Sequence, residues 1–260
     1  MGIVGLAWVT ATHQRFVYRI IIFIGVAGGL VGSASSGTRA SWVSLFFVLL
    51  MLIVGFWKLG LRKSSISILT LLIIVTSSFF YQSHSSIAQR VYSSASDIAL
   101  YYEDSEPRGS LSTRFELWKG STSLFFERPV FGWGEQGYRE SMARLADSGE
   151  IGLGNRDYVH AHNDWFNEAA KRGSIGVFVL LGVYFLPIYT FFRSAVYGHA
   201  KNDRLIGLGG LVVSLNFLVY GLAHHAFGSN NGIMNYAFWT AVFCGSCIFS
   251  RNNQKHVKCS

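Results

Sequence analysis

The stretch HAHNDWFNEAAKRGSIGVFVLLGVYFLPIYTFF, residues 160–192, joins a long polar segment to a strongly apolar one. At about 100° per residue, one set of mostly small residues falls within about 40° of a single line along a helix. The set is His162, Phe166, Ala169, Gly173 and Gly176, and the far side carries Asp164, Asn167, Glu168 and Lys171. We therefore predict an amphipathic helix whose small-residue seam lets a second helix backbone approach closely.

The rest of the chain repeats this alternation of apolar runs and polar links. Half of its 260 residues are hydrophobic and 14 % are charged, whereas a soluble domain carries about a quarter charged residues. Apolar runs near membrane-spanning length occupy residues 20–34, 40–57, 66–80, 174–192, 205–222 and 232–249. We predict an all-α, polytopic integral membrane protein with about six transmembrane helices.

Basic residues cluster in alternate links between the predicted spans. They lie within residues 13–19, 58–63, 193–204 and 251–258. Cytoplasmic links carry an excess of lysine and arginine, so we place these links in the cytoplasm. The link at Arg39, the long segment 81–163 and the link at His224 then face outward, which in a bacterium is the periplasm.

The long outer segment is expected to be partly helical. Thr113 and Glu116 have the spacing of a capping box and predict a helix from Arg114 to about Glu127, stopped by Pro129. A second helix is predicted over residues 138–147. The chain thus divides into N-terminal transmembrane helices (1–80), a periplasmic loop domain (81–163) and C-terminal transmembrane helices (164–260).

Several other function classes are disfavoured. The net charge of +8 is better explained by topology signals than by nucleic-acid binding. Residues 132–137, GWGEQG, fit the letters of a dinucleotide fingerprint but lack the surrounding βαβ pattern, so we interpret them as a turn between helices. Cys244 and Cys247 lie inside an apolar run, which favours plain packing over redox chemistry.

Polar residues at the outer ends of spans are candidates for function. Neither the spacing of His160 and His162 nor the adjacent pair His224 and His225 matches a common zinc pattern, so no metal is expected. His162 could serve a structural role, or it could act on a substrate, because its ordinary pKa lies near neutral pH. An arginine at an outward link, Arg39, runs against the positive-inside bias and suggests an anionic partner.

These residues carry a resemblance to a known family. His162 and Asn163, a gap of nine residues, and then Gly173-x-x-Gly176 resemble the signature of the O-antigen ligase family, whose superfamily includes O-antigen polymerases and protein O-oligosaccharyltransferases. The stretch 128–134, RPVFGWG, is similar to the family's Pro-x-x-Gly-x-Gly element. Arg39 resembles an arginine of its upstream helix pair, and Arg114 the one that opens its loop helix.

The resemblance implies a GT-C-like glycosyltransferase. Such an enzyme takes a glycan from undecaprenyl diphosphate at the outer face of the bacterial inner membrane and passes it to lipid A–core or another hydroxyl acceptor. By the same resemblance, Arg39 and Arg114 would bind the diphosphate and His162 would act on the acceptor hydroxyl. Supporting positions are His160, Asn163, Asp164, Gly173, Gly176, Gly132 and Gly134, with His160 expected to point away from His162. No cofactor is expected.

Some alternatives stay open at this point. The acceptor could be lipid A–core, another lipid-linked repeat or a protein hydroxyl, which separates a ligase from a polymerase and an oligosaccharyltransferase. Family members usually have about twice as many spans, so either a second chain supplies the missing N-terminal spans or this chain is a truncated product. A non-enzymatic transporter or assembly subunit would instead need polar residues within its spans, where Asn216 and Asn235 are the main candidates.

Overall fold

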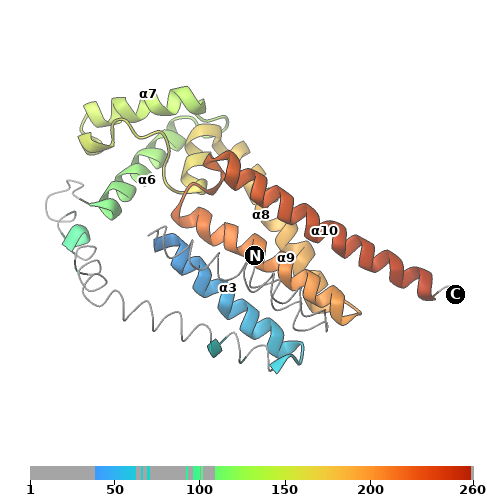
Figure 1. The fold of residues 1–260 in the computed structure, drawn as a ribbon. Coiled ribbons are helices and arrows are strands. Elements are labelled where there is room, and N and C mark those ends of the chain that lie inside the picture. The colour runs from blue at the N-terminus through green and yellow to red at the C-terminus, as the bar shows by residue number, and fades with distance from the viewer. Residues whose placement is uncertain are drawn as a thin grey trace. The chain divides into compact units, whose positions relative to one another are not determined.

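The computed structural model describes the backbone of residues 39–62 and 109–258 and of a few residues between them: 66, 69–70, 92, 96–99 and 101. Side chains are described over 46–62, 109–250 and those same intervening residues. All regular elements of the described part are helices (Figure 1). The all-α prediction is therefore confirmed for this part of the chain.

The chain forms two compact units. Among the described elements, unit 1 contains α3 (Arg39–Lys58), α10 (Asn230–Lys258) and the parts of α8 and α9 within residues 184–220. Unit 2 contains α6 (Ser110–Glu127), α7 (Gly134–Asp147), the short helix η1 (Leu153–Asn155), α8 up to residue 183, and residues 221–228 with the short helix η2 (Ala226–Gly228). The full bounds are Asp164–Tyr197 for α8 and Lys201–Ala223 for α9.

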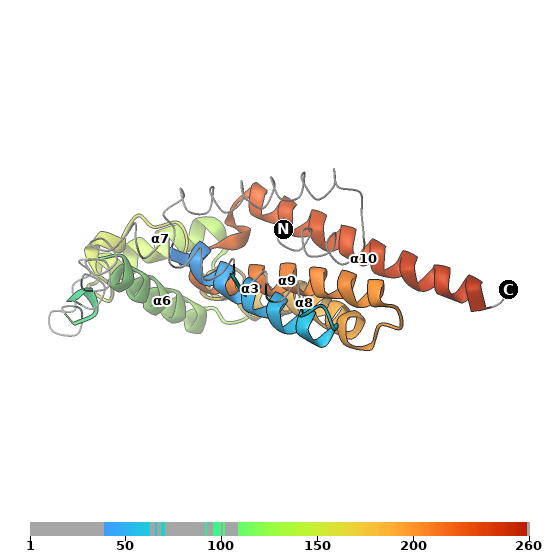
Figure 2. The same ribbon diagram turned by 60° about the horizontal axis from the view of Figure 1, so that its bottom comes forward.

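The core of unit 1 lies between α3 and α9, which run side by side in both ribbon views (Figures 1 and 2). Large aliphatic and aromatic side chains fill it: Leu49, Leu52, Phe56, Leu205, Leu208 and Val212. Gly55 permits the close approach, because a Cβ there would lie 2.6 Å from the side chain of Leu208. A glycine on the α9-facing side of α3 thus serves packing.

Three described helices are long and apolar enough to cross a membrane: Asp164–Tyr197, Lys201–Ala223 and Asn230–Ser250. They contain the fourth, fifth and sixth predicted spans. The second predicted span coincides with α3, whose described apolar part is shorter, Phe46–Lys58. The first predicted span and nearly all of the third lie outside the described residues, so the total of about six stays a prediction.

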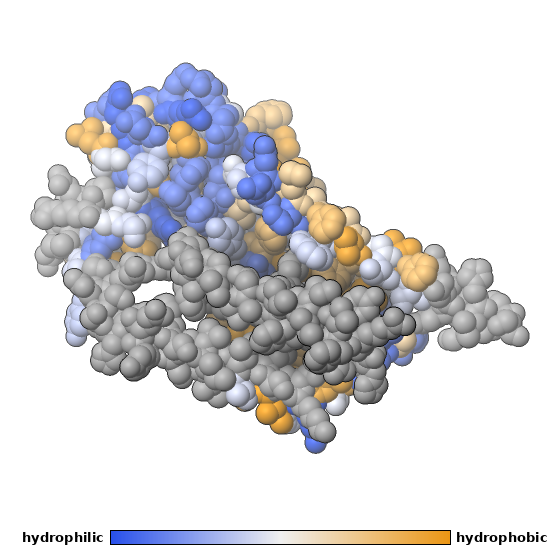
Figure 3. Space-filling view, in the orientation of Figure 1, coloured by the Kyte–Doolittle hydropathy of each residue, from blue (hydrophilic) through white to orange (hydrophobic). Residues whose placement is uncertain are grey.

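The core of unit 2 joins α6, α7 and the first part of α8. Leu117 and Leu124 of α6 pack against Tyr138, Met142 and Leu145 of α7, and all five are fully buried. The outer surface of α7 is mostly hydrophilic (Figure 3). Unit 2 therefore has an apolar core of its own, and the bounds 81–163 expected for a loop domain stay a prediction.

The predicted start of α6 was wrong. The helix begins at Ser110, because the carboxylate of Asp97 accepts hydrogen bonds from the backbone N–H of Leu111 and of Ser112. Glu116, which was expected to close a capping box with Thr113, instead accepts hydrogen bonds from the Tyr101 hydroxyl and the Gly152 N–H. A carboxylate from outside the helix thus caps α6, together with a local hydrogen bond from the Gly109 N–H to Ser112 Oγ.

The small-residue seam was also wrong. His162 precedes α8, which begins at Asp164, so it does not lie on the helix. Gly173 has φ 63° and ψ −156°, which breaks the helical path and rotates the following residues away from the expected line. Three residues expected on the far side of the helix from the seam are instead buried: Asp164, Asn167 and Lys171.

Candidate active site

The segment before α8 holds His162 in an uncommon backbone conformation. Its φ is 51°, and it is the one non-glycine residue with positive φ among those described. Such a conformation costs a non-glycine residue about 1–2 kcal/mol and persists only where its surroundings enforce it. Backbone strain of this kind is concentrated at functional sites, which makes the segment a candidate.

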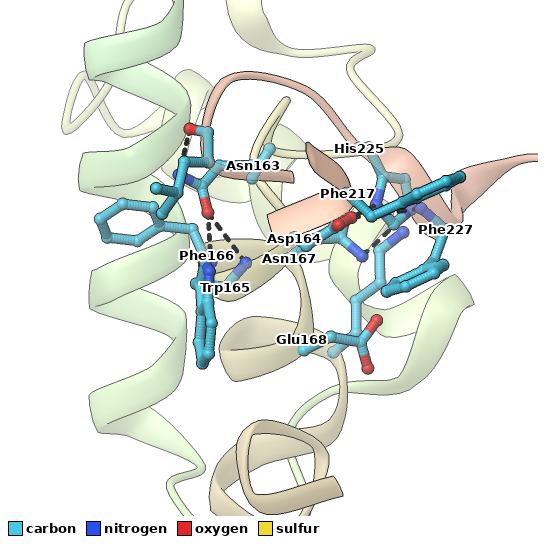
Figure 4. Close-up of polar contacts among 12 residues, drawn as sticks. Asn163, Asp164, Trp165, Phe166, Asn167, Glu168, Phe217, His225 and Phe227 are labelled. Carbon is cyan, nitrogen blue, oxygen red and sulfur yellow. Dashed lines mark hydrogen bonds and ion pairs between the residues drawn. The ribbon is translucent and has the colours of Figure 1, made fainter. Parts of the chain in front are cut away.

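Asn163 supplies part of that enforcement (Figure 4). Its side-chain Oδ1 accepts a hydrogen bond from the N–H of Trp165 at 2.8 Å and a longer one from Phe166, so it caps α8. Its Nδ2 donates to the carbonyl oxygen of Leu222 at 2.8 Å. One asparagine therefore starts the helix and fastens the segment 221–228 beside it.

Asp164, in the first turn of α8, forms a largely buried pair with His225 of the segment 221–228 (Figure 4). Asp164 Oδ1 lies 2.7 Å from Nδ1 of His225, and the same oxygen accepts a weaker bond from the Phe227 N–H. The Asp164 side chain is 1 % exposed. Asn167, one turn later, lies 3.4 Å from the other ring nitrogen of His225. These bonds fix the His225 ring and the segment that carries it.

Three more imidazole rings gather near the His225 ring of this pair. The ring centroids of His160 and His162 are 4.2 Å apart and nearly perpendicular. The ring centroids of His162 and His224 are 5.8 Å apart, and those of His160 and His225 are 5.6 Å apart. Two segments about 60 residues apart in sequence thus build one cluster, which we call the histidine cluster: His160, His162, His224 and His225.

Three rings of the histidine cluster, those of His160, His162 and His224, favour the uncharged form. Burial lowers the pKa of His162 to about 4, with further contributions from the neighbouring His160, Arg114 and His224. Burial also lowers the pKa of His160 and of His224. At neutral pH His162 is therefore neutral and can accept a proton.

Helix α6 closes one side of the site. The Trp118 indole stacks on the Phe166 ring at a centroid distance of 5.3 Å, and its N–H donates to the carbonyl oxygen of Ala161. Arg114, one turn earlier, is half-buried and its charge acts on both His162 and His224. A guanidinium and a neutral imidazole are thus held near each other by the same helix.

The opposite side of the loop is held by a buried lysine. Lys171 Nζ donates to Glu135 Oε1 and to the carbonyl oxygen of Val159, each at 2.8 Å. The lysine is 3 % exposed and the glutamate is more than half exposed. A buried ammonium needs such partners, so this bond ties the residue before His160 to α8 and to the start of α7.

Two glycines let the turn between α6 and α7 cross α8 at backbone distance. A Cβ at Gly173 would lie 2.4 Å from the carbonyl oxygen of Val130, and a Cβ at Gly132 would lie 2.5 Å from the carbonyl carbon of Lys171. Both glycines also have positive φ. Two backbone hydrogen bonds stabilise the crossing. The Ser174 N–H donates to the Pro129 carbonyl oxygen, and the Trp133 N–H donates to the Ala170 carbonyl oxygen. The stretch 128–134 and the Gly173-x-x-Gly176 motif therefore meet at this crossing.

Comparisons with known proteins agree with this arrangement. The family model described as O-antigen ligase matches residues 20–181, which is more than half of the chain. This chain belongs to the O-antigen ligase family. An uncharacterised protein of Haemophilus influenzae is 23 % identical over 222 residues, which is 85 % of this chain and 55 % of that protein. The chain therefore spans about half the length of this curated relative.

The residues singled out from the O-antigen ligase signature fall into two groups in the structure. His160, His162, Asn163, Asp164 and Arg114 all lie in or beside the histidine cluster. Gly132 and Gly173 form the backbone crossing. Gly176 packs against Arg172, which lies one turn earlier in α8. Gly134 has a positive φ of 70° but open space around it, so it serves the turn alone.

One expectation about the site changes. His160 does not point away from His162, because the loop turns at His162 and brings the rings together. The side chain of Arg39 lies outside the described residues, so its expected role stays a prediction. Among the described residues, no group of three His, Cys, Asp or Glu side chains has an arrangement that could hold a metal ion.

His224 and His225 were not among the predicted site residues. Their position in a short outward link next to a predicted span was the available signal, but Asp164, the partner of His225, is 61 residues away in sequence. Sequence spacing cannot show such a pairing, since it depends on how the link folds back onto α8.

Proposed function

We propose that this chain carries the active site of a membrane glycosyltransferase of the O-antigen ligase family. It would move a glycan from undecaprenyl diphosphate to an acceptor hydroxyl, and lipid A–core is the acceptor we favour. The observation that carries this proposal is a half-buried, neutral His162 on a strained backbone, near the Arg114 guanidinium, within a chain of this family. The site would face the periplasm of a bacterial inner membrane.

In the proposed reaction the acceptor oxygen attacks the anomeric carbon of the donor sugar. The bond from that carbon to the diphosphate oxygen breaks, and undecaprenyl diphosphate leaves with the electron pair. The proton of the hydroxyl passes to His162, which the low pKa keeps free to accept it. Nδ1 of His162 is buried and has no hydrogen-bond partner among the described residues. We therefore propose that the other ring nitrogen, Nε2, accepts the proton.

Arg114 is proposed to stabilise the diphosphate. Its planar guanidinium can donate two parallel hydrogen bonds to phosphate oxygens and keeps its charge at any physiological pH. Arg39 is proposed as a second donor to the same group. Because the leaving group is stabilised by arginine in this scheme, the reaction should proceed without a metal ion.

The proposal is tested by transfer in vitro with purified protein, a lipid-linked glycan and separate acceptors. A ligase transfers to lipid A–core, a polymerase extends a second lipid-linked repeat, and an oligosaccharyltransferase labels a protein hydroxyl. Transfer that persists with a chelator supports the metal-independent scheme. If the chain alone is inactive, co-expression with a chain supplying further spans should restore transfer. Inactivity in both cases would favour a non-enzymatic subunit.

A further inference from the structure

The last turn of α6 and the turn that follows it expose large apolar side chains. Phe126 is 73 % exposed, Phe131 is 77 % exposed and Val130 is about half exposed. We call these three residues the lip. The exposed residues of α7, the next helix along the chain, are in contrast mostly polar and include Glu135, Gln136, Arg139, Glu140 and Arg144. Exposed clusters of aromatic and aliphatic residues in a polar surface mark contact sites.

The lip is joined to the point where α8 becomes a membrane span. The N–H of Ser174 donates to the Pro129 carbonyl at 2.8 Å, and the N–H of Ile175 lies 3.5 Å from the Val130 carbonyl. Before Gly173 the helix buries polar side chains such as Lys171. After Gly173 and the exposed Ser174, the exposed residues of the helix include the apolar Ile175, Phe178 and Val179. The lip and the exposed surface of the span are therefore continuous.

The connection between the lip and α8 also sets how far the histidine cluster lies from the membrane surface. Nine residues of α8 separate Asp164 from Gly173, which at about 1.5 Å per residue is about 14 Å. If the bilayer begins near Gly173, the histidine cluster lies that far outside it. A site at this height needs a fixed distance from the lipid surface, because its donor would be anchored there.

Basic side chains accompany the lip at the same level. Arg128 is exposed, and its guanidinium carbon lies 3.9 Å from the centroid of the Trp133 ring. Arg172 is exposed and donates to Glu168. Aromatic and aliphatic side chains beside arginine and tryptophan are the composition that lipid headgroup layers favour.

We propose that the lip inserts into the headgroup and upper acyl region of the bilayer that α8 enters. Phe126, Val130 and Phe131 contact lipid, and Arg128 lies at the level of the lipid phosphates. The insertion holds unit 2 at one height, and with it the histidine cluster. The occupant of this surface is the phospholipid of the surrounding membrane.

The test uses an environment-sensitive fluorophore on a single cysteine. In a background with Cys244, Cys247 and Cys259 replaced by alanine, Phe131→Cys is labelled and the protein is placed in nanodiscs. Leu153→Cys is the matched control. It is also a highly exposed apolar residue of unit 2, and it adjoins Gly152, which bonds to Glu116 about three turns of α6 above the lip.

The label at residue 131 should emit at shorter wavelength than the label at 153. It should be quenched by nitroxide lipids that carry the spin label near the headgroup, and be protected from iodide in solution. The label at 153 should show the reverse. Phe126→Cys should repeat the result at 131 and serves if Phe131→Cys does not fold.

Two outcomes would overturn the proposal. Equal iodide quenching at 131 and 153 would leave the lip in water. Protection from iodide without quenching by nitroxide lipids would show that protein, such as a second copy of the chain, covers the lip instead.

Discussion

At the scale of single residues, the site depends on what surrounds His162. The sequence indicated this histidine through its motif, but its positive φ could not be predicted, since tertiary contacts impose that conformation on a non-glycine residue. Its pKa could not be predicted either. The pKa of His162 lies below the ordinary value because the ring is half-buried among other histidines and near Arg114.

The low pKa of His162 predicts the pH dependence of transfer. A ring that must be neutral to accept a proton loses function as pH falls through its pKa, so kcat/KM should decline near pH 4 rather than near 6.5. An anionic diphosphate stabilises the imidazolium and raises the pKa, so the decline in kcat should lie at higher pH than the decline in kcat/KM. Rates measured at each pH on protein that remains monodisperse check this. Coinciding declines near pH 6.5 would contradict it.

Arg114 should act on the donor and not on the acceptor. Arg114→Ala should weaken transition-state stabilisation by about 2–4 kcal/mol, as for the loss of one partner of a buried charge pair. Arg114→Lys should recover part of this, since the charge remains and the planar fork is lost. Lys119→Ala, an exposed cation one turn and a half further along α6, is the control. The measurement is the dependence of rate on donor concentration, and full activity in Arg114→Ala would remove it from the site.

At the scale of elements, sequence reasoning found the helices better than their contacts. The predicted helix 138–147 is present as the larger part of α7, and the span 174–192 lies within α8. The helix seam and the capping box were wrong, because Gly173 turns the chain and Asp97 caps α6 from outside the helix. Both errors came from reading local periodicity where a distant segment decides the geometry.

The glycine crossing predicts a graded response to alanine. Gly173→Ala adds a clash with the Val130 carbonyl to the cost of positive φ, whereas Gly134→Ala has a similar φ and open space. Gly134→Ala should therefore cost about 1–2 kcal/mol of stability. Gly173→Ala should cost clearly more and also reduce transfer, because the lip and α8 separate. Thermal unfolding in detergent compares the two, and equal losses would show that the crossing does not matter.

At the scale of the whole molecule, the alternation of basic links predicts the orientation of every span. The described helices agree with the last three predicted spans but do not by themselves orient them. Cysteines introduced near residues 100 and 228 should react with an impermeant reagent added outside. Those near residues 60 and 198 should react only after the membrane is opened. Outside labelling near residue 60 would reverse the orientation and place the histidine cluster in the cytoplasm.

The central claim is that His162 acts on the acceptor while the arginines bind the donor. The most direct measurement is single-turnover transfer by His162→Ala, with donor binding measured separately on the same protein. His199→Ala, an exposed histidine of unit 1, is the control. We predict that His162→Ala loses about a hundred- to ten-thousandfold in transfer rate, with donor affinity unchanged and the control at the wild-type rate. Transfer by His162→Ala at the wild-type rate would contradict the account.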